Sequence, residues 1–318
     1  MRRAEVVTPY NYNLNQHQIL KTPAAAAAPS LQKRAGTLSF LFTTQIIYYF
    51  KSEVKNINKN YKNTIVLEGE ISVLSVMNNN PERIRSIILK DGIKYNNASR
   101  VLDTAKNKNI KTEFWTTENI EKITNGKNHG GIIAIAAKKD FLSVQELFLL
   151  FDNAKDNISI AVLEGIEDPY NLGYAVRALY TQGVDALIIQ ERDLDFSEPI
   201  IEKASTGTFS MMNTAVFGKS DNEKAELSDF LKSNAFTIYC VDKRKDAESI
   251  FNINFAKRTA FVIGGEKRGI SKIFADKADK FIQIPYNCND SFAYSLTSQT
   301  AATIISYEIH RQFSKNIL

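Results

Sequence analysis

The segment AFVIGGEKRG, residues 260–269, joins an apolar run to a turn rich in glycine and charge. Four apolar residues followed by a turn signal are typical of a buried strand in a parallel sheet. Glycine lets the backbone come close to a ligand or to a neighbouring segment. Because open α/β sheets bind ligands beyond the carboxyl ends of their strands, the segment predicts a strand that leads into a binding site.

Strand-like and helix-like segments alternate around this stretch. The pattern predicts strands at 160–163, 186–189, 213–217, 236–240, 260–263 and 281–284, and helices at 171–182, 222–232 and 291–312. Such alternation is typical of an α/β fold whose mostly parallel sheet is covered by helices on both faces. We therefore expect a C-terminal α/β domain over residues 158–318.

The preceding part of the chain has shorter elements. Strands are expected at 64–67, 84–89, 112–115 and 130–136, and helices at 71–77 and 100–108. These define a small α/β domain over residues 63–140, followed by a linker at 141–157 with a helix at 144–151. Residues 37–62 are expected to form a basic helical lead-in, and residues 1–36, with their alanine run, a disordered tail or an artefact.

Charge is unevenly distributed along the chain. Residues 1–62 carry nine basic and two acidic residues, a net charge of +7, and residues 63–140 carry +3. Residues 141–318 carry 19 basic and 24 acidic residues, a net charge of −5. A basic front of this kind indicates either contact with a polyanion or a solubilising tail, and charge alone leaves both open.

The few cysteines and histidines exclude two classes of protein. Cys240 and Cys288 with three scattered histidines make neither a disulfide framework nor a zinc site, so we expect no metal and a reducing, cytoplasmic setting. No apolar run reaches the ~20 residues of a membrane helix, so no membrane contact is expected.

A second segment, DPYNLG at residues 168–173, is followed by Arg177. Proline and asparagine are common at the start of a helix. Arg177 falls outside the apolar face of that helix, on a side that Gly173, four residues earlier, is expected to clear. The arginine is therefore either a solvated surface residue or a contact to a phosphate or hydroxyl group.

Two further observations bear on the glycine-rich turn. Gly264 and Gly269 have the spacing of a P-loop, but Ile270 stands where the lysine must be, which disfavours a nucleotide-hydrolysing enzyme. The third segment, at residues 295–302, is a helix rich in small residues. It indicates a tight helix contact, a dimer seam or a cofactor wall.

Taken in this order, the three segments resemble motifs 1, 2 and 3 of the SpoU–TrmH family of RNA 2′-O-methyltransferases. The matching residues are Asn171, Gly173 and Arg177 for motif 1, Gly264, Glu266, Gly269, Ile284 and Pro285 for motif 2, and Ser295, Leu296, Tyr307 and Glu308 for motif 3. The front domain is similar to the family's substrate-binding domain through residues 66–69 and 129–134.

The resemblance implies transfer of a methyl group from S-adenosylmethionine to a ribose 2′-hydroxyl of structured RNA, with ribosomal RNA ahead of transfer RNA. It also implies a deep trefoil knot in the C-terminal domain and a homodimer. Arg177, Asn171 and Glu266 would be the catalytic residues. The cofactor would be held by the backbone around Gly264, Gly265, Gly269, Ile284, Pro285 and Leu296. The candidates for contact with the RNA are Arg83, Arg85, Lys90 and Lys94.

Motif 3 departs from the family pattern at two positions. Thr297 stands where the family usually has asparagine, and Gln299 where it has serine. The departures favour an alternative, a catalytically impaired RNA-binding relative, whereas the intact Asn171, Arg177 and Glu266 favour the enzyme. The sequence leaves open which RNA and which nucleotide would be modified.

Overall fold

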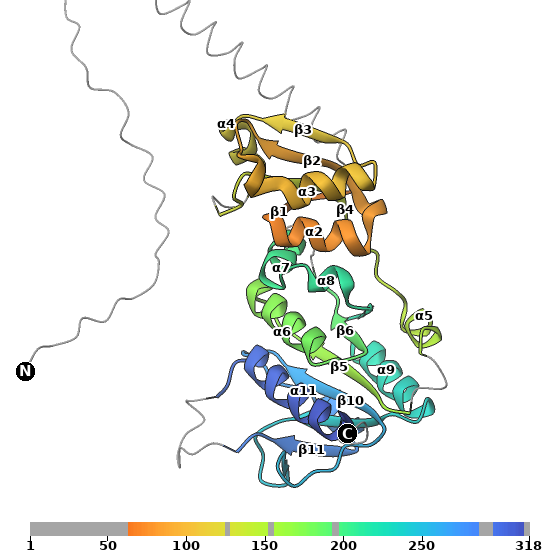
Figure 1. Ribbon diagram of the computed structural model, residues 1–318. Coiled ribbons are helices and arrows are strands. Elements are labelled where there is room, and N and C mark those ends of the chain that lie inside the picture. Colours follow the sequence, from red (N-terminus) through yellow and green to blue (C-terminus); the bar gives the residue numbers. More distant parts are fainter. Residues whose placement is uncertain (1–62, 125–127, 152–155, 193–196, 286–294, 315–318) are drawn as a thin grey trace, which may run out of the picture. The chain divides into compact units, whose positions relative to one another are not determined.

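The computed structural model describes residues 63–124, 128–151, 156–192, 197–285 and 295–314 (Figure 1). The expected tail at 1–36 and helical lead-in at 37–62 lie outside the described residues. By its contacts, the chain from Asn63 onward forms one unit. It contains two sheets, and helices cover each.

The first sheet has four strands in the order β1-β4-β2-β3. Strand β4 runs antiparallel to β1 and β2, and β3 runs parallel to β2. The strands are β1 (Thr64–Glu68), β2 (Ile84–Lys90), β3 (Thr112–Trp115) and β4 (Ile132–Ala137). The helices are α2 (Glu70–Asn79), α3 (Tyr95–Asn107), α4 (Thr117–Glu121) and a 3₁₀ turn, η1 (Pro81–Arg83).

The second sheet has seven strands in the order β7-β6-β5-β10-β8-β11-β9, and its neighbours pair in parallel. This confirms the predicted parallel α/β architecture. The strands are β5 (Ile158–Glu164), β6 (Ala186–Gln190), β7 (Thr214–Phe217), β8 (Thr237–Val241), β9 (Glu248–Ser249), β10 (Arg258–Gly264) and β11 (Lys280–Gln283).

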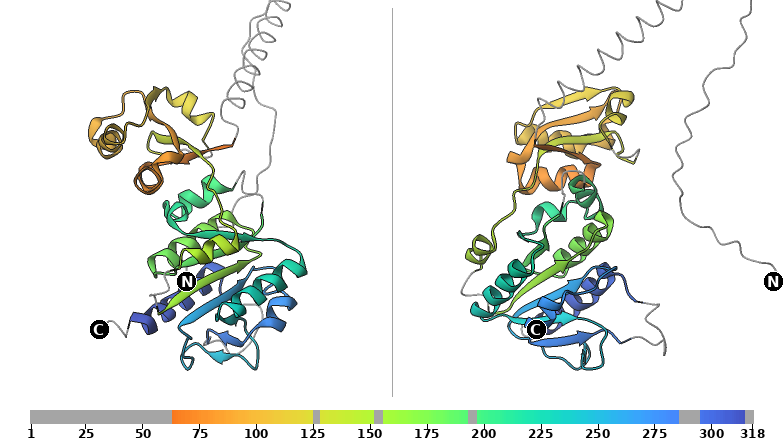
Figure 2. Two further views of the ribbon diagram at one scale, coloured as in Figure 1. Left: turned by 90° about the vertical axis from the view of Figure 1, so that its right-hand side faces the viewer. Right: turned by 180° about the vertical axis from the view of Figure 1, so that it is seen from behind.

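Helices lie on both faces of this sheet (Figure 2). Successive residues of a strand point to opposite faces, so Ala161 and Leu163 of β5 join one hydrophobic core and Ile160 and Val162 join the other. The first core is covered by α6 (Pro169–Thr181), α7 (Glu198–Ala204), α8 (Thr208–Met211) and α11 (Ser298–Ser314). The second is covered by α5 (Val144–Leu149), α9 (Asp221–Ser233) and α10 (Lys272–Lys277).

Some elements differ from the sequence prediction. Helix α3 begins at Tyr95, five residues before the expected start, and α11 begins at Ser298 within the described residues. The short helices α7, α8 and α10 were not predicted. Each has seven residues or fewer, which is too short to show a helical period in the sequence.

A buried charge cluster joins the four-stranded sheet to helix α7. The Arg83 guanidinium donates to Glu198 Oε1 at 2.8 Å, to Ser210 Oγ at 2.6 Å and to the Ala137 carbonyl oxygen, and it lies 3.5 Å from Glu202. Only 8% of Arg83 is exposed. The predicted RNA contact of Arg83 is therefore wrong, because its donors are already used inside the protein.

The same cluster contains two carboxyl groups and a lysine whose pKa values are shifted by burial. Burial raises the pKa of Glu202 to about 7, and burial lowers the pKa of nearby Lys139 to about 8. Burial also raises the pKa of Glu198. Removing charged groups from water costs free energy unless they are well paired. Because these groups change protonation between about pH 5 and 8, the contact between the four-stranded sheet and α7 is sensitive to pH.

We predict that Glu202→Gln changes how stability depends on pH. A carboxyl whose pKa is raised by folding contributes stability that is lost as pH rises through the folded-state pKa. Wild type should therefore lose stability between pH 5 and 7.5, and the variant should lose less. The difference in Tm, variant minus wild type, should grow by a few degrees over this range, measured by scanning calorimetry.

The control for this measurement is Glu226→Gln, which changes an exposed glutamate of α9. Its Tm should stay parallel to that of wild type at every pH. A constant Tm difference for Glu202→Gln would contradict the account of the cluster.

Candidate active site at the ends of β5 and β10

Two glycines bring the loops after β5 and β10 into backbone contact. The strands are adjacent and parallel, with Glu164 opposite Gly264. A Cβ atom added to Gly265 would lie 2.0 Å from the Gly165 carbonyl oxygen, so a side chain there has no room. Gly165 itself has a positive φ of 71°, which favours glycine. The close approach fixes the two loops against each other.

The loop after β10 is closed by its own backbone. The Gly269 N–H donates to the Gly265 carbonyl at 2.9 Å, and Gly269 has a φ of 62°. Gly264 packs beneath the loop, where an added Cβ would lie 2.1 Å from the Gly269 carbonyl carbon. The turn holds Glu266, Lys267 and Arg268 on its exposed side.

Asn171 and Glu266 meet across these loops. Helix α6 begins with Asp168, whose Oδ1 accepts from the Tyr170 N–H at 2.7 Å, and Pro169 occupies the first turn. One turn further on, Asn171 Nδ2 donates to Glu266 Oε1 at 3.0 Å. The structure therefore joins residues that are 95 positions apart in the sequence.

Arg177 is not part of this pair. It lies six residues after Asn171, about 9 Å along the helix axis, and makes no recorded bond within the described residues. Its side chain is exposed. It shares a helix face with Tyr170 and Tyr174, at spacings of seven and three residues, and these rings are 50% and 48% exposed. Arg177 thus sits in an exposed stripe with two tyrosines.

Gly173 has a different role from the one expected. An added Cβ atom would lie 2.6 Å from Ala204 Cβ and 2.9 Å from the Ile201 carbonyl oxygen, both on α7. The glycine therefore lets α6 and α7 pack closely. The expectation that it clears a side for Arg177 is wrong.

The third segment is tied to the second. Ser298 Oγ, at the start of α11, donates to the Gly264 carbonyl at 2.7 Å. Thr297 precedes the helix, and its Oγ1 accepts from the Thr300 N–H at 3.4 Å, as an N-terminal cap does. Asparagine and threonine can both cap a helix. Thr297 therefore caps the start of α11 in this chain.

The residues expected to hold the cofactor, together with Gln299, leave both apolar surface and a polar group open to a ligand. Ile284 and Leu296 are only half-buried, which leaves apolar surface for a ligand to cover, and Pro285 is exposed. Gln299 Oε1 is buried with no hydrogen-bond partner among the described residues. These groups lie on segments that follow β11 and precede or begin α11.

Sequence reasoning missed a second set of polar residues nearby. Arg192 donates to the carbonyl oxygens of Ile166 and Glu167, at 2.8 Å each, and so holds the loop that leads into α6. Burial lowers the pKa of Arg192. Buried Glu164 pairs with Lys224 at 3.0 Å and accepts from the Ser271 N–H. No charge pattern in the sequence could signal Arg192, because its partners are backbone carbonyls.

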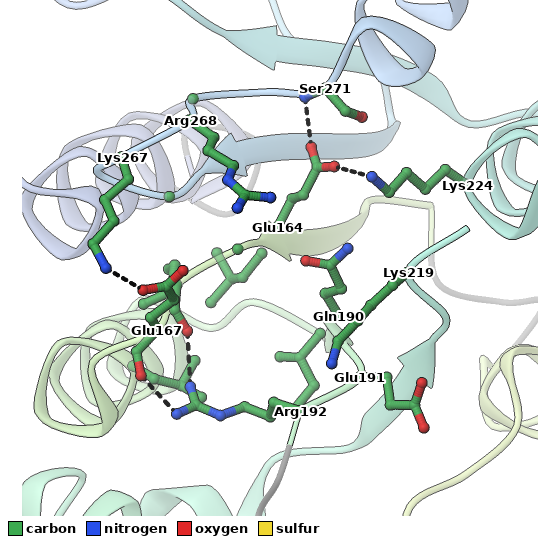
Figure 3. A pocket seen from close by; sticks show the side chains of 17 residues that line it. Glu164, Glu167, Gln190, Glu191, Arg192, Lys219, Lys224, Lys267, Arg268 and Ser271 are labelled. Atoms are coloured by element: carbon green, nitrogen blue, oxygen red, sulfur yellow. Dashed lines mark hydrogen bonds and ion pairs between the residues drawn. The ribbon is translucent and has the colours of Figure 1, made fainter. Parts of the chain in front are cut away.

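These residues border a cavity of about 650 Å³ beyond the ends of β5, β6 and β10 (Figure 3). Within the described residues, no group of three or more His, Cys, Asp or Glu side chains could hold a metal ion. The helices described in residues 63–314 include none long and apolar enough to cross a membrane.

Comparison with known families supports the resemblance. Residues 159–307 match the model of the SpoU rRNA Methylase family, and residues 66–142 match the model named RNA 2′-O ribose methyltransferase substrate binding. A Staphylococcus epidermidis protein named "Putative TrmH family tRNA/rRNA methyltransferase" is 30% identical over 230 residues, which cover 72% of this chain and 88% of that protein. A Staphylococcus aureus (strain MSSA476) protein of the same name is 29% identical, covering 72% and 89%.

Solved structures share the fold. A crystal structure of an RNA 2′-O ribose methyltransferase aligns with a TM-score of 0.64 at 19% identity and covers 82% of this chain and 92% of that one. The SpoU methyltransferase AviRb from Streptomyces viridochromogenes, in complex with AdoMet, aligns with a TM-score of 0.62 at 18% identity, covering 80% and 92%. The chain belongs to the SpoU–TrmH family of RNA methyltransferases, with a substrate-binding domain before the methylase domain.

We predict that Ser298→Ala loosens the contact between the second and third segments. It removes the bond to the Gly264 carbonyl and should lower the free energy of unfolding by about 1 kcal/mol. Ser306→Ala is the matched control, because this buried serine of α11 bonds only within its own helix, to the Thr303 carbonyl. Denaturant titration measures both. Equal losses for the two variants would show that the link to Gly264 adds nothing.

Proposed function

We propose that this protein transfers a methyl group from S-adenosylmethionine to a ribose 2′-hydroxyl of RNA, with ribosomal RNA as the substrate. The contact between Asn171 and Glu266 at the ends of β5 and β10 carries the proposal. It places two polar residues of the matching motifs at the edge of a parallel sheet, where α/β enzymes bind their ligands. The family membership supplies the reaction class.

The cofactor supplies an activated methyl group when it is bound. Gly264, Gly265, Gly269, Ile284, Pro285 and Leu296 would hold it, and a trefoil knot in the C-terminal domain would frame them. Gly264 is anchored for this role by Ser298. The site needs to place the hydroxyl oxygen in line with the methyl group and to exclude water.

The ribose hydroxyl is a poor nucleophile and must be polarised. Arg177 would donate to it and orient the adjacent phosphate, because a guanidinium forms paired hydrogen bonds with such groups. A guanidinium is a reluctant base, so we assign it polarisation in place of proton abstraction. Asn171 and Glu266 would fix the loop geometry around the ribose through their mutual hydrogen bond.

We also propose that the protein is a homodimer whose seam includes α6 and α11. Tyr170 and Tyr174 on α6 and Tyr307 on α11 are all about half-exposed or more, and the two helices pack against each other. Exposed aromatic rings gathered on neighbouring helices are typical of an interface. Arg177 lies on the same exposed face of α6 as Tyr170 and Tyr174. Dimer formation through this face would therefore bring Arg177 toward the active site of the second copy.

The four-stranded domain would bind the RNA. Arg85, Lys90 and Lys94 have exposed side chains and remain the proposed contacts to phosphates and 2′-hydroxyls. Cys240 is a free, buried thiol, which fits the reducing cytoplasm as the place of action.

We predict that Arg177→Ala lowers methyl transfer by about 100-fold, the usual loss when one donor to a reacting oxygen is removed. Arg177→Lys keeps a charge but loses the paired donors, so its loss should be smaller, about tenfold. Tritium transfer from labelled S-adenosylmethionine to ribosomal RNA transcribed in vitro measures both. Alkali-resistant dinucleotides in the product would identify the ribose as the target. Wild-type rates in either variant, with normal cofactor binding, would refute the role of Arg177.

We predict a dimer mass in light scattering at micromolar concentration. Tyr174→Arg places a charge in the proposed seam and should shift the mass toward the monomer. Phe251→Arg is the matched control, because Phe251 is 79% exposed outside the seam helices. A monomer mass for wild type would refute the dimer.

A further inference from the structure

The cavity beyond β5, β6 and β10 overlaps only in part with the residues expected to hold the cofactor. Its lining shares Gly265 and Gly269 with that set but does not include Gly264, Ile284 or Leu296. It extends toward the ends of β6 and β7 and the start of α9, where Gln190, Lys219 and Lys224 line it. The protein therefore has room for a second ligand beside the proposed methyl-transfer site.

Four of the eight charged side chains that line the cavity form two ion pairs with one another (Figure 3). Glu164 is held by Lys224 and the Ser271 N–H. Glu167 pairs with Lys267, and Arg192 binds two backbone carbonyls. These contacts pair two carboxylates with lysines and engage two nitrogens of Arg192, whose Nε is buried with no hydrogen-bond partner among the described residues.

Several polar groups in the lining remain available, among them Ser271 Oγ, which is buried with no hydrogen-bond partner in the described part of the chain. Lys219, Arg268 and Gln190 make no side-chain hydrogen bond or ion pair recorded within the described ranges, and all three line the cavity. Figure 3 shows Gln190 and Lys219 reaching into the space between Glu164 and Arg192, with Arg268 on the opposite loop. Exposed Glu191 is the one acidic lining residue without a recorded partner in this part of the structure.

The free groups suit a ligand with an anionic part and a polar, flat part. Two cations can bind a phosphate, and a glutamine amide can donate to and accept from a base edge. The walls add apolar surface from Leu163, Ile166, Leu172 and Ile189. A volume of about 650 Å³ is far larger than a lone phosphate needs, given that one water takes about 30 Å³, and is typical of a site for a small organic ligand.

The cavity also adjoins the proposed catalytic residues. Arg268 lies in the same closed turn as Glu266, and Leu172 follows Asn171 on α6. A ligand in the cavity would therefore lie next to the Asn171–Glu266 pair. An RNA strand whose ribose is methylated there must carry neighbouring nucleotides within a few ångströms of that pair.

We propose that this cavity binds a nucleotide next to the methylated ribose, with Lys219 and Arg268 on its phosphate and Gln190 on its base. The inference rests on the proposed function, because it assigns the nucleotide to the same RNA strand. Two of the proposed contacts, Lys219 and Gln190, lie outside the three motifs.

The first test uses nucleoside 5′-monophosphates as probes, titrated against the full-length protein by saturation-transfer NMR. We expect at least one of the four to bind, and Lys219→Ala and Arg268→Ala each to weaken it about threefold to tenfold, as expected for an exposed cation. Lys106→Ala, an exposed lysine on α3, is the matched control and should bind as wild type does. Added S-adenosylmethionine should leave the nucleotide bound.

Several results would overturn the inference. Inorganic phosphate that competes as well as the nucleotides would show that the apolar walls and Gln190 contribute nothing. Displacement by S-adenosylmethionine would make the cavity the cofactor site. Absence of nucleotide binding, or binding unaffected by Lys219→Ala and Arg268→Ala, would place the nucleotide elsewhere.

The second test separates this inference from the proposed function. In methyl transfer to ribosomal RNA, Lys219→Ala and Gln190→Ala should act mainly by raising KM for the RNA, about fivefold. Methyl transfer with an unchanged KM in both variants would overturn the subsite and leave the function standing. Nucleotide binding without methyl transfer to any RNA would overturn the proposed methyltransferase function. The bound nucleotide could then no longer be assigned to a substrate RNA.

Discussion

The contact between Gly165 and Gly265 is the constraint on which the site depends. The register of β5 and β10 places the two glycines side by side, and the space between them admits no Cβ atom. As a result, the loop that starts α6 and the closed turn after β10 share one surface. Asn171 and Glu266 can then reach each other at 3.0 Å although they come from distant parts of the chain.

Surrounding contacts support this arrangement. Arg192 holds the first loop by two carbonyl oxygens, and Ser298 holds the strand end at Gly264. Gly173 lets α7 pack tightly against α6, and α7 in turn carries Glu198 and Glu202 to Arg83. The four-stranded domain is thus joined by a buried charge cluster to a helix that packs on the helix bearing Asn171 and Arg177. A reacting group held by packed helices and strands keeps its geometry better than one on an isolated loop.

The sequence predicted the parallel α/β sheet well, because buried strands such as 260–263 have continuous apolar runs bounded by glycine. The motif resemblance also singled out Asn171 and Glu266, which the structure brings together. Arg83 was wrongly expected to face RNA, since charge alone cannot reveal a buried partner such as Glu198. The cavity with Lys219 and Gln190 could not be foreseen either, because it depends on which strands are neighbours.

The most direct test of the account is calorimetric titration of the folded protein with S-adenosylmethionine and S-adenosylhomocysteine. Both compounds should bind with a Kd near micromolar, equivalent to about −8 kcal/mol. Leu296→Asp, which puts a charge on the proposed apolar wall, should weaken the binding of both compounds. If correctly folded protein bound neither compound, the loops after β10 and β11 and the start of α11 would not form a binding site for the methyl donor.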